Sequence, residues 1–407
     1  MSTNTPNPAS EDTPSASGEP LPRVWFSQDK VWHYRLPIWD RLIEKNKNDY
    51  TVEVYGRLDD GHTFGGGTRP YINQRDVDER SFLGLGYQRW PDMMERLERE
   101  RPHVLVMENN IRNLGCWQIP RAAPRLGLGT VGWTKVQSFS SIPAPIIQAA
   151  KRPFYKAFDA QIVYGQTSYD DLVSLGYPGD RIRIANNTID TNRIFEETDE
   201  LLRQGQELKA RHGLADKRIL LCCATMYEKK RQGDLIEAWK TIRDWDPGME
   251  LVFVGGGEYL DTVREMAKAA DPDRIHVLGR VPEGEDYIWI GASDLNVFCG
   301  GLGLAINQCL AFGKPTIVAE EPGPDSEIVR HEETGWRFER GNIPELLSTL
   351  KHVMENDDER TRICANARAL MRDEVSIQNM VDKIDSAIRL ALETSLRRRG
   401  KKGRTES

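Results

Sequence analysis

A glycine-rich segment that follows an apolar stretch carries the clearest potential for chemistry in this sequence. Residues 295–298 predict a strand, Gly300, Gly301 and Gly303 follow it, and the apolar residues up to Gly313 predict a helix. Glycine lets a ligand approach the backbone closely. Free N–H groups and the helix dipole favour negative charge at a helix N-terminus. The segment therefore predicts a site for a phosphate-bearing ligand, and a nucleotide is the first candidate.

Strand-like and helix-like segments alternate along the chain, which predicts parallel sheets with helices on both faces. We expect an α/β fold of two facing, Rossmann-like, doubly wound domains, in which ligands bind at the carboxyl ends of the strands. The predicted strands are residues 24–27, 51–55, 104–107, 130–133, 160–164 and 182–185 in the first half, and 218–223, 251–254, 275–278, 295–298 and 316–319 in the second.

Composition changes suggest where the domains begin and end. Residues 1–20 are rich in Ser, Thr, Pro and acidic residues, which predicts a disordered tail. Residues 21–195 are expected to form the first domain and residues 196–375 the second, near a charged helical stretch at about 199–212. A C-terminal helix, about 377–396, and a basic tail complete the chain in residues 376–407.

The overall composition is that of an ordinary globular protein. A net charge of −7 argues against a partner that is a nucleic acid. The sequence has neither an apolar run near the ~20 residues that span a bilayer nor a secretory signal pattern. We therefore expect a cytoplasmic protein. The six cysteines form no CxxC pair, which predicts buried free thiols and no metal site.

A cluster of basic residues near the C-terminus allows two interpretations. It is either a solvated tail or a peripheral contact with anionic lipids at the inner face of a membrane, where each cation adds ~1 kcal/mol. The cluster consists of Arg397, Arg398, Arg399, Lys401, Lys402 and Arg404.

From about residue 24 to 392 the chain resembles the family 4 glycosyltransferases, which have the two-domain GT-B architecture. The segments that carry the resemblance are residues 34–37 (YRLP), 159–165 (DAQIVYG), 181–190 (RIRIANNTID) and the glycine-rich segment. The resemblance implies a retaining enzyme without cofactor or metal. Its partners would be a nucleotide-sugar donor and a glycan or glycolipid acceptor.

The family holds the donor diphosphate with an arginine and a lysine after the first strand of the second domain. Lys230 occupies the lysine position, whereas Thr225 stands at the arginine position, so Lys229 or Arg231 could replace that arginine. Lys230 would stabilise negative charge on the leaving diphosphate through charge-assisted hydrogen bonds.

The family also carries two glutamates at the glycine-rich segment, and here those positions are Gly300 and Gln308. Gln308 can still hydrogen-bond a ribose diol, whereas Gly300 offers no side chain. Glu327 matches an acidic position near the ribose. The remaining donor-binding candidates are backbone positions, namely Gly256, Gly301, Leu302, Gly303 and Leu304.

The acceptor side would lie in the first half of the chain. Tyr34 and Arg35 follow the first strand, and Arg35 could hold a phosphate. Glu108 and Asn109 end another strand, and Lys135 follows a third, where the family often has a histidine. The candidates for binding the acceptor are thus Tyr34, Arg35 and Asn109, and Glu108 and Lys135 join Lys230 as candidates for catalysis.

Two alternatives to a sugar transferase stay open. The departures at Thr225, Gly300 and Gln308 favour a non-catalytic nucleotide- or glycan-binding homologue. A nucleotide-sugar epimerase can share the architecture, although the segments that carry the resemblance do not suggest it. An Asp-x-Asp at residues 76–78, a metal motif in another transferase fold, lies in a charged loop and is attributed to chance.

Overall fold

The computed structural model describes residues 20–57, 69–74, 78–82, 85–90, 92–134 and 144–403. The described residues divide into two compact units. Unit 1 comprises the described residues up to Tyr164, Ser168–Ala185 and the described residues from Val381 onward, and unit 2 comprises Gly165–Thr167 and Asn186–Met380. The chain thus passes into unit 2 after Ala185, whereas the prediction placed the change after residue 195. Residues 1–19 of the predicted tail at 1–20, most of the 76–78 motif and Lys135 lie outside the described residues.

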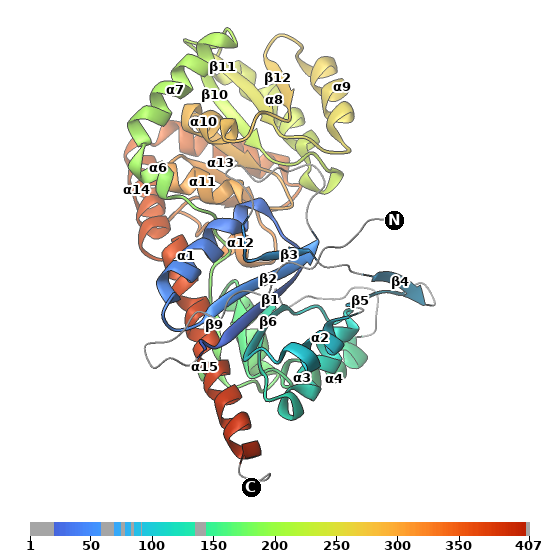
Figure 1. The fold of residues 1–407 in the computed structure, drawn as a ribbon. Coiled ribbons are helices and arrows are strands. Elements are labelled where there is room, and N and C mark those ends of the chain that lie inside the picture. Colours follow the sequence, from blue (N-terminus) through green and yellow to red (C-terminus); the bar gives the residue numbers. More distant parts are fainter. Residues whose placement is uncertain are drawn as a thin grey trace, which may run out of the picture. The chain divides into compact units, whose positions relative to one another are not determined.

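Unit 1 is built on a seven-stranded sheet in the order β3-β2-β1-β6-β7-β8-β9 (Figure 1). All of its strand pairs are parallel. The strands are β1 (Arg23–Lys30), β2 (Thr51–Arg57), β3 (Ile72–Gln74), β6 (Val104–Glu108), β7 (Gly129–Thr134), β8 (Ala160–Val163) and β9 (Ile182–Ile184). The helices are η1 (His33–Arg35), α1 (Leu36–Asn46), α2 (Met93–Glu100), α3 (Leu114–Leu126), α4 (Ala144–Tyr155), α5 (Gln166–Ser174, in unit 1 from Ser168) and η2 (Gly179–Arg181).

Three short strands between residues 72 and 89 are absent from the predicted strands. Ile72–Gln74 pairs with β2 as the edge strand β3. The antiparallel pair β4 (Asp78–Phe82) and β5 (Leu85–Arg89) follows it. These strands are short and polar, so they lack the apolar alternation that identifies a strand in a sequence.

Unit 2 contains a six-stranded parallel sheet in the order β12-β11-β10-β13-β14-β15. The strands are β10 (Arg218–Cys223), β11 (Met249–Val254), β12 (Ile275–Gly279), β13 (Leu295–Phe298), β14 (Thr316–Ala319) and β15 (Trp336–Phe338). The helices are α6 (Asn192–Glu196), α7 (Thr198–Arg211), η3 (Glu228–Lys230), α8 (Gln232–Trp245), α9 (Leu260–Ala270), α10 (Glu285–Ala292), α11 (Ala305–Phe312), α12 (Pro324–Glu327), α13 (Ile343–Glu355) and α14 (Asp357–Asp373).

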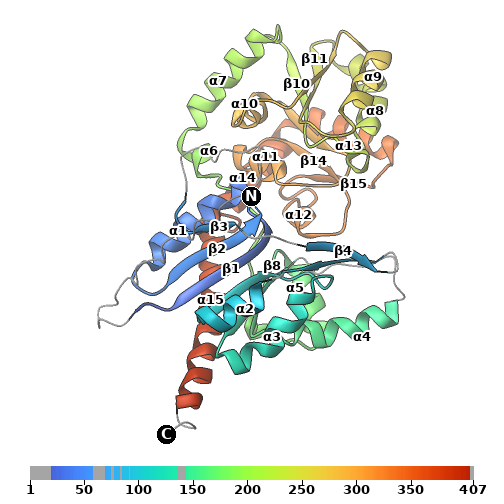
Figure 2. The same ribbon diagram turned by 45° about the vertical axis from the view of Figure 1, so that its right-hand side comes forward.

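Helices cover both faces of the sheet of unit 2, which explains why its strands are almost entirely apolar. In β10, Leu220 and Cys222 pack with α8, α9 and α13 on one face. Ile219 and Leu221 pack with α7, α10 and α11, the helices that cover the other face of the sheet (Figure 2). The predicted α/β class with two Rossmann-like, doubly wound domains is therefore confirmed.

The chain closes with α15 (Ile377–Gly403), which from Val381 belongs to unit 1 and is longer than predicted. Arg398 forms an ion pair with Asp159, in which Nη1 of the arginine lies 2.7 Å from Oδ2 of the aspartate. Arg399 donates to the carbonyl oxygen of Pro102 over 2.7 Å. The interpretation of the basic cluster as a solvated tail is therefore wrong for Arg398 and Arg399, because both guanidinium groups attach the helix to unit 1. Arg404 lies outside the described residues.

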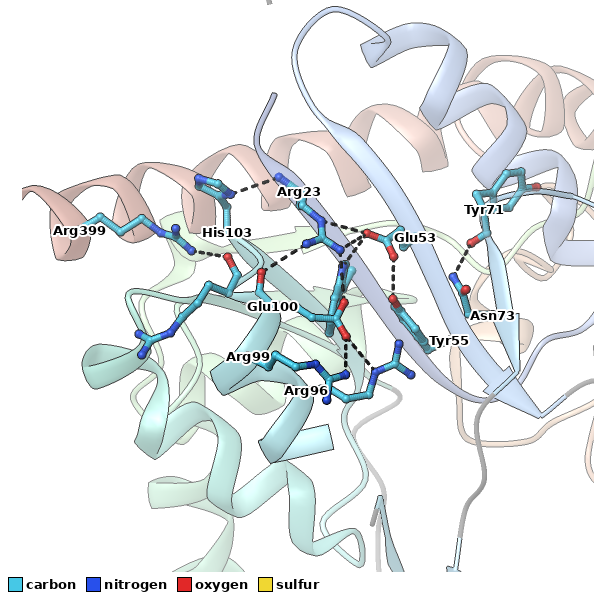
Figure 3. Close-up of polar contacts among 12 residues, drawn as sticks. Arg23, Glu53, Tyr55, Tyr71, Asn73, Arg96, Arg99, Glu100, His103 and Arg399 are labelled. Carbon is cyan, nitrogen blue, oxygen red and sulfur yellow. Dashed lines mark hydrogen bonds and ion pairs between the residues drawn. The ribbon is translucent and has the colours of Figure 1, made fainter. Parts of the chain in front are cut away.

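Glu53 in β2 collects hydrogen bonds from neighbours in and beside the sheet (Figure 3). Its Oε1 accepts from Arg23 Nη2 at 2.8 Å and from Trp25 Nε1 at 2.9 Å. Its Oε2 accepts from the hydroxyl group of Tyr55 at 2.6 Å. Arg23 also pairs with Glu100 of α2, at 3.4 Å. This carboxylate therefore ties β1, β2 and α2 together.

Replacing Glu53 by alanine is expected to destabilise the protein. Removing it leaves the guanidinium of Arg23 and two donors short of an acceptor, a loss of about 2–3 kcal/mol. Urea unfolding measures the effect. The control is Glu95→Ala, whose carboxylate is 80% exposed and 3.7 Å from Arg99, and it should cost less than about 0.5 kcal/mol. Equal losses in both variants would contradict the role given to Glu53.

His103 makes the stability of unit 1 depend on pH. Its Nδ1 accepts from the backbone N–H of Arg23 at 3.2 Å, so the ring is neutral in the folded state. Burial, together with the positive charges of Arg399 and Arg23, lowers the pKa of His103 to about 4. An unfolded histidine titrates near 6.5, so the unfolded state binds more protons between these values and stability falls as the pH falls.

We therefore expect the free energy of unfolding to decrease as the pH is lowered from about 6.5 to about 4, with a smaller decrease in His103→Gln. Unfolding by urea at a series of pH values measures both slopes. His33→Gln, at an exposed histidine, should keep the slope of the parent protein. An unchanged slope in His103→Gln would show that another group is responsible.

Candidate functional site

Unit 2 has one topological switch point, between β10 and β13. These strands are neighbours in the sheet, with Leu220 opposite Leu295, but the chain leaves them toward opposite edges of the sheet. Ligands of such sheets bind beyond the carboxyl ends of the strands at this point. The segment 224–231 follows β10, and the segment 300–304, here called the elbow, follows β13. The structure thus brings together the two segments that the sequence selected for donor binding.

Lys230 connects these two segments. It ends η3, is partly buried, and its Nζ donates a hydrogen bond to the carbonyl oxygen of Gly301 in the elbow. Any side chain at Gly303 would bring its Cβ to 3.4 Å from the same Nζ. The ammonium group therefore lies against the elbow, where it can contact an anion bound there.

The elbow presents backbone donors at the start of α11. Within the described part of the chain, no acceptor is recorded for the N–H groups of Leu302, Gly303 and Leu304. Leu304 is the N-cap of α11 and provides no side-chain cap. Gly301 has φ +52°, a conformation that favours glycine. N–H groups without an acceptor in the protein at a helix N-terminus, with a lysine beside them, are suited to hold a phosphate.

The position of the missing first glutamate has no room for a side chain. A Cβ at Gly300 would lie 2.7 Å from the carbonyl oxygen of Lys229. A carboxylate reaches this place from another strand end, because Glu321 follows β14 and its Oε1 accepts from the N–H of Gly301 at 2.8 Å. Arg340 pairs with the same oxygen at 3.0 Å.

Sequence reasoning missed Glu321. It is one of two adjacent glutamates before a proline, in a turn without any recognisable motif. Its position before Pro322 and two residues after the apolar strand was the available signal, since side chains just after parallel strands gather at the ligand edge.

Gln308, at the position of the second glutamate, is buried on α11 with 5% of its surface exposed. Its Nε2 donates to Asp286 Oδ2 of α10 at 3.0 Å. The neighbouring Asn307 donates to the carbonyl oxygen of Asn187 at 3.1 Å. The Gln308 amide therefore already bonds a protein carboxylate, and ribose binding by this side chain stays a prediction.

Two further donor-side positions pack backbone against backbone. A Cβ at Gly255 would lie 2.0 Å from the carbonyl oxygen of Ala224, so this glycine lets the turn after β11 touch the turn after β10. The carbonyl oxygen of Gly256 accepts from the N–H of Met226 at 2.9 Å. Thr225 lies exposed between these contacts. Gly256 and Thr225 thus shape the segment after β10.

The two proposed replacements for the family arginine differ in their surroundings. Arg231 pairs with Asp234 at 2.6 Å, and its backbone has φ +55°. Lys229 is exposed, with its Nζ 5.7 Å from the centroid of the Tyr227 ring. The exposed ammonium of Lys229 is the better placed of the two to reach a ligand.

Glu327 uses its carboxylate within unit 2. Its Oε2 accepts from the N–H of Gln166 at 2.6 Å and its Oε1 from the N–H of Thr167 at 3.0 Å. Gln166 and Thr167 are grouped with unit 2. These contacts give Glu327 a structural task, and its predicted contact with a ribose stays a prediction.

Unit 1 has its own switch point, between β1 and β6, and Arg35 lies in an aromatic environment after β1. Arg35 is buried, and its Nη2 donates to the hydroxyl oxygen of Tyr164 at 2.7 Å. Its guanidinium lies 4.8 Å from the centroid of the Trp133 ring and 5.7 Å from that of Tyr34. Burial raises the pKa of Tyr164, so this phenol stays protonated. A charged, preorganised guanidinium of this kind can bind a phosphate or a carboxylate.

Glu108 and Asn109 end β6 at this switch point and differ in exposure. Glu108 is exposed, and its Oε2 accepts from the N–H of Asp29 at 3.2 Å. Asn109 is buried and donates to Gln161 Oε1 at 3.2 Å, through space that a side chain at Gly132 would fill. Glu108 is thus accessible to a ligand, whereas Asn109 links β6 to β8.

Known proteins share the fold of this chain and part of its sequence. The fold is shared by the crystal structure of Anabaena HepE in complex with UDP, with a TM-score of 0.69, 16% identity, and 90% of this chain and 99% of that chain covered. Residues 205–370 match the family model described as glycosyl transferases group 1.

Proteins of similar sequence are also glycosyltransferases by name. An uncharacterized glycosyltransferase of Haemophilus influenzae is 25% identical over 41% of this chain and 48% of its own length. A GDP-mannose-dependent alpha-(1-6)-phosphatidylinositol monomannoside mannosyltransferase of Mycobacterium tuberculosis is 25% identical over 40% of this chain and 45% of its own length. The chain spans about half the length of the curated relatives it matches.

The two Rossmann-like units, with a lysine and an open elbow at the switch point of the second, have the GT-B fold of glycosyltransferases. Residues 205–370 thus carry the match to the group 1 glycosyltransferases. The resemblance is confirmed at this level, and the family 4 subtype stays a prediction. None of the helices among the described residues combines the length and the apolar character needed to cross a membrane.

Proposed function

We propose that this protein transfers a sugar from a nucleotide-diphospho-sugar to a hydroxyl group of a glycan or glycolipid, with retention of anomeric configuration and without a metal. The observation that carries the proposal is the contact of Lys230 with Gly301 across the switch point of unit 2, beside the open N–H groups of the elbow. A cation and several amides converge there on the place where a ligand diphosphate would lie.

The chemistry follows from this arrangement. The bond between the anomeric carbon and the diphosphate oxygen breaks, and the acceptor oxygen bonds to the same face of the sugar. The acceptor proton passes to the departing diphosphate. Negative charge grows on the diphosphate in the transition state, and preorganised donors at that position usually provide the largest catalytic term. Lys230 and the elbow amides would supply them.

The names of similar proteins suggest which donors to test first. The mycobacterial relative is described as GDP-mannose-dependent, and HepE structures contain UDP or UDP-glucose. We therefore take GDP-mannose and UDP-glucose as the first candidate donors. Thr225, Lys229, Gly256, Gln308 and Glu327 stay proposed contacts for the donor.

The proposed acceptor residues belong to unit 1. Arg35 would hold an acidic or phosphorylated part of the acceptor, with Tyr34 and Asn109 beside it. Glu108 is the exposed carboxylate at the end of β6, so it would orient the acceptor hydroxyl. Lys135 is retained as a proposed catalytic residue, although it lies outside the described residues.

Product analysis with and without an acceptor tests the function. The purified protein is incubated with each donor, alone and together with a panel of glycan and glycolipid acceptors, and the products are identified by mass spectrometry. A transferase yields a glycosylated acceptor and free nucleoside diphosphate. Conversion of the donor alone into an epimer would contradict the proposal. Binding of a donor without turnover across the panel would favour a non-catalytic homologue.

Peripheral contact with a membrane from the cytoplasmic side is a separate proposal. Arg398 and Arg399 hold α15 in place, so Arg397, which is exposed, is the residue to change. Sedimentation with anionic vesicles should decrease in Arg397→Gln. Equal sedimentation of both proteins would remove the basis for this contact.

A further inference from the structure

A pocket opens at the edge of the sheet of unit 2 that lies opposite the elbow. It has a volume of about 490 Å³ and is bordered by the first residues of β10, β11 and β13, by the residues before β14, and by α14. The elbow lies beyond the carboxyl ends of the same strands. A strand of six residues such as β10 spans roughly 20 Å, so this pocket is separate from the proposed donor site.

Positive charge dominates the wall of this pocket. One carboxylate, that of Asp294, stands among the cations Arg218, Lys314, Arg360 and Arg368. Arg218 forms an ion pair with Asp246, and Arg360 forms one with Asp357 at 2.7 Å. These two arginines are therefore already neutralised.

Lys314 and Arg368 have a different environment. Lys314 Nζ donates to the carbonyl oxygen of Ser293 at 2.8 Å, and Arg368 donates to the carbonyl oxygen of Ala311 at 2.8 Å and to Thr198 Oγ1 at 3.0 Å. Across the described residues, no ion pair within 4.0 Å is recorded for either side chain. Both cations are thus held in place by neutral oxygens, and the guanidinium of Arg368 also lies 5.0 Å from the centroid of the Phe195 ring. Both residues line the pocket.

Burial makes this arrangement costly, and the carboxylate of Asp294 offsets only part of the cost for Lys314. The pKa of Lys314 is lowered, chiefly by burial, because an ammonium removed from water loses solvation that carbonyl oxygens replace only in part. Met249, Leu295, Phe312 and Met354 provide apolar surface on the same wall. The pocket therefore combines two fixed cations with space for a carbon skeleton.

We propose that this pocket binds a small phosphorylated metabolite, with its phosphate on Lys314 and Arg368 and its carbon part on the apolar wall. The proposal does not depend on the transferase function. It adds to unit 2 a ligand site that lies away from the switch point.

Cys364 offers a readout inside the pocket. It lines the wall and is partly exposed, whereas the other five cysteines are buried. Burial raises the pKa of its thiol to about 11, so the thiol reacts slowly and its labelling can be followed in mildly alkaline buffer. A ligand on Lys314 and Arg368 would shield Cys364 from a maleimide.

The experiment uses the full chain carrying Lys230→Ala, which weakens the proposed donor site. Maleimide labelling of Cys364 is followed by peptide mass spectrometry during titration with inorganic phosphate and with glycerol phosphate. We expect saturable protection of Cys364. Loss of one charge-assisted contact in Lys314→Met should raise the protecting concentration about tenfold or more. Lys268→Met removes an equally charged, exposed side chain of α9 and should change nothing.

Arg368→Gln provides a second test if Lys314→Met fails to fold, which circular dichroism would reveal. Protection that is absent with both phosphates would overturn the proposal. Protection that persists unchanged in Lys314→Met and Arg368→Gln would do the same. Protection by vesicles containing phosphatidic acid, but not by glycerol phosphate, would also overturn it, because the ligand would then be a lipid surface.

Discussion

The variant Lys230→Ala is expected to transfer sugar about a hundred- to a thousandfold more slowly than the parent protein, the usual cost of losing one preorganised donor to developing charge. The ammonium of Lys230 bonds the elbow carbonyl of Gly301 and lies beside the open amides. Its positive charge is worth most when charge accumulates on the leaving diphosphate. The same charge also contacts the diphosphate of the bound donor, so kcat should fall and the KM for the donor should rise, both measured by release of nucleoside diphosphate over a range of donor concentrations.

The neighbouring Lys229 provides the matched control. It carries the same charge one residue earlier, but it is exposed, and its Nζ lies beside the Tyr227 ring. Lys229→Ala should lower kcat less than about tenfold, since an exposed charge is screened by solvent and salt. Thermal unfolding checks that both variants are folded. Near-parental transfer by Lys230→Ala would show that the donor binds elsewhere.

Replacing Glu321 by alanine is expected to lower kcat/KM for the donor by about ten- to a hundredfold, because charge-assisted hydrogen bonds contribute about 1.5–3 kcal/mol each. The carboxylate holds the N–H of Gly301 and the guanidinium of Arg340. Without it, the elbow loses the contact that fixes the first of its glycines. Positioning errors of this kind reduce rates even when the chemistry is unchanged.

A graded series distinguishes this role from a general effect of charge. Glu321→Gln keeps an acceptor for Gly301 but loses the ion pair with Arg340, so its kcat/KM should lie between those of the parent and Glu321→Ala. Glu320→Ala removes the adjacent, exposed glutamate and should leave kcat/KM unchanged. If Glu320→Ala and Glu321→Ala lowered it equally, the contact with Gly301 would not explain the effect.

The fold could be predicted largely from the sequence because its core strands are buried on both faces. Such strands are short apolar runs, and those of β1, β10 and β11 stand out from the charged helices around them. The edge strand β3 and the pair β4 and β5 were missed, because polar residues form them and backbone pairing alone identifies them.

The site was predictable where a backbone pattern creates it and not where tertiary contacts do. The glycines of the elbow indicate a strand-to-helix turn in the sequence itself, and Lys230 follows from spacing after a strand. Glu321 reaches the elbow through the neighbouring strand β14, and Arg398 reaches Asp159 from the other end of unit 1 in sequence. Such pairings over long sequence separations leave no local signal.

The most direct test of the central claim is donor binding at the switch point of unit 2. Thermal unfolding is measured with GDP-mannose, UDP-glucose, the dTDP- and ADP-sugars and the free nucleotides, for the parent protein and for Lys230→Ala. A ligand at 100 times its dissociation constant adds about 2.7 kcal/mol of stability. We predict that one nucleotide sugar raises the unfolding temperature selectively and that Lys230→Ala loses most of this shift. A shift that is equal in both proteins, or absent with every nucleotide, would contradict the assignment of the donor site.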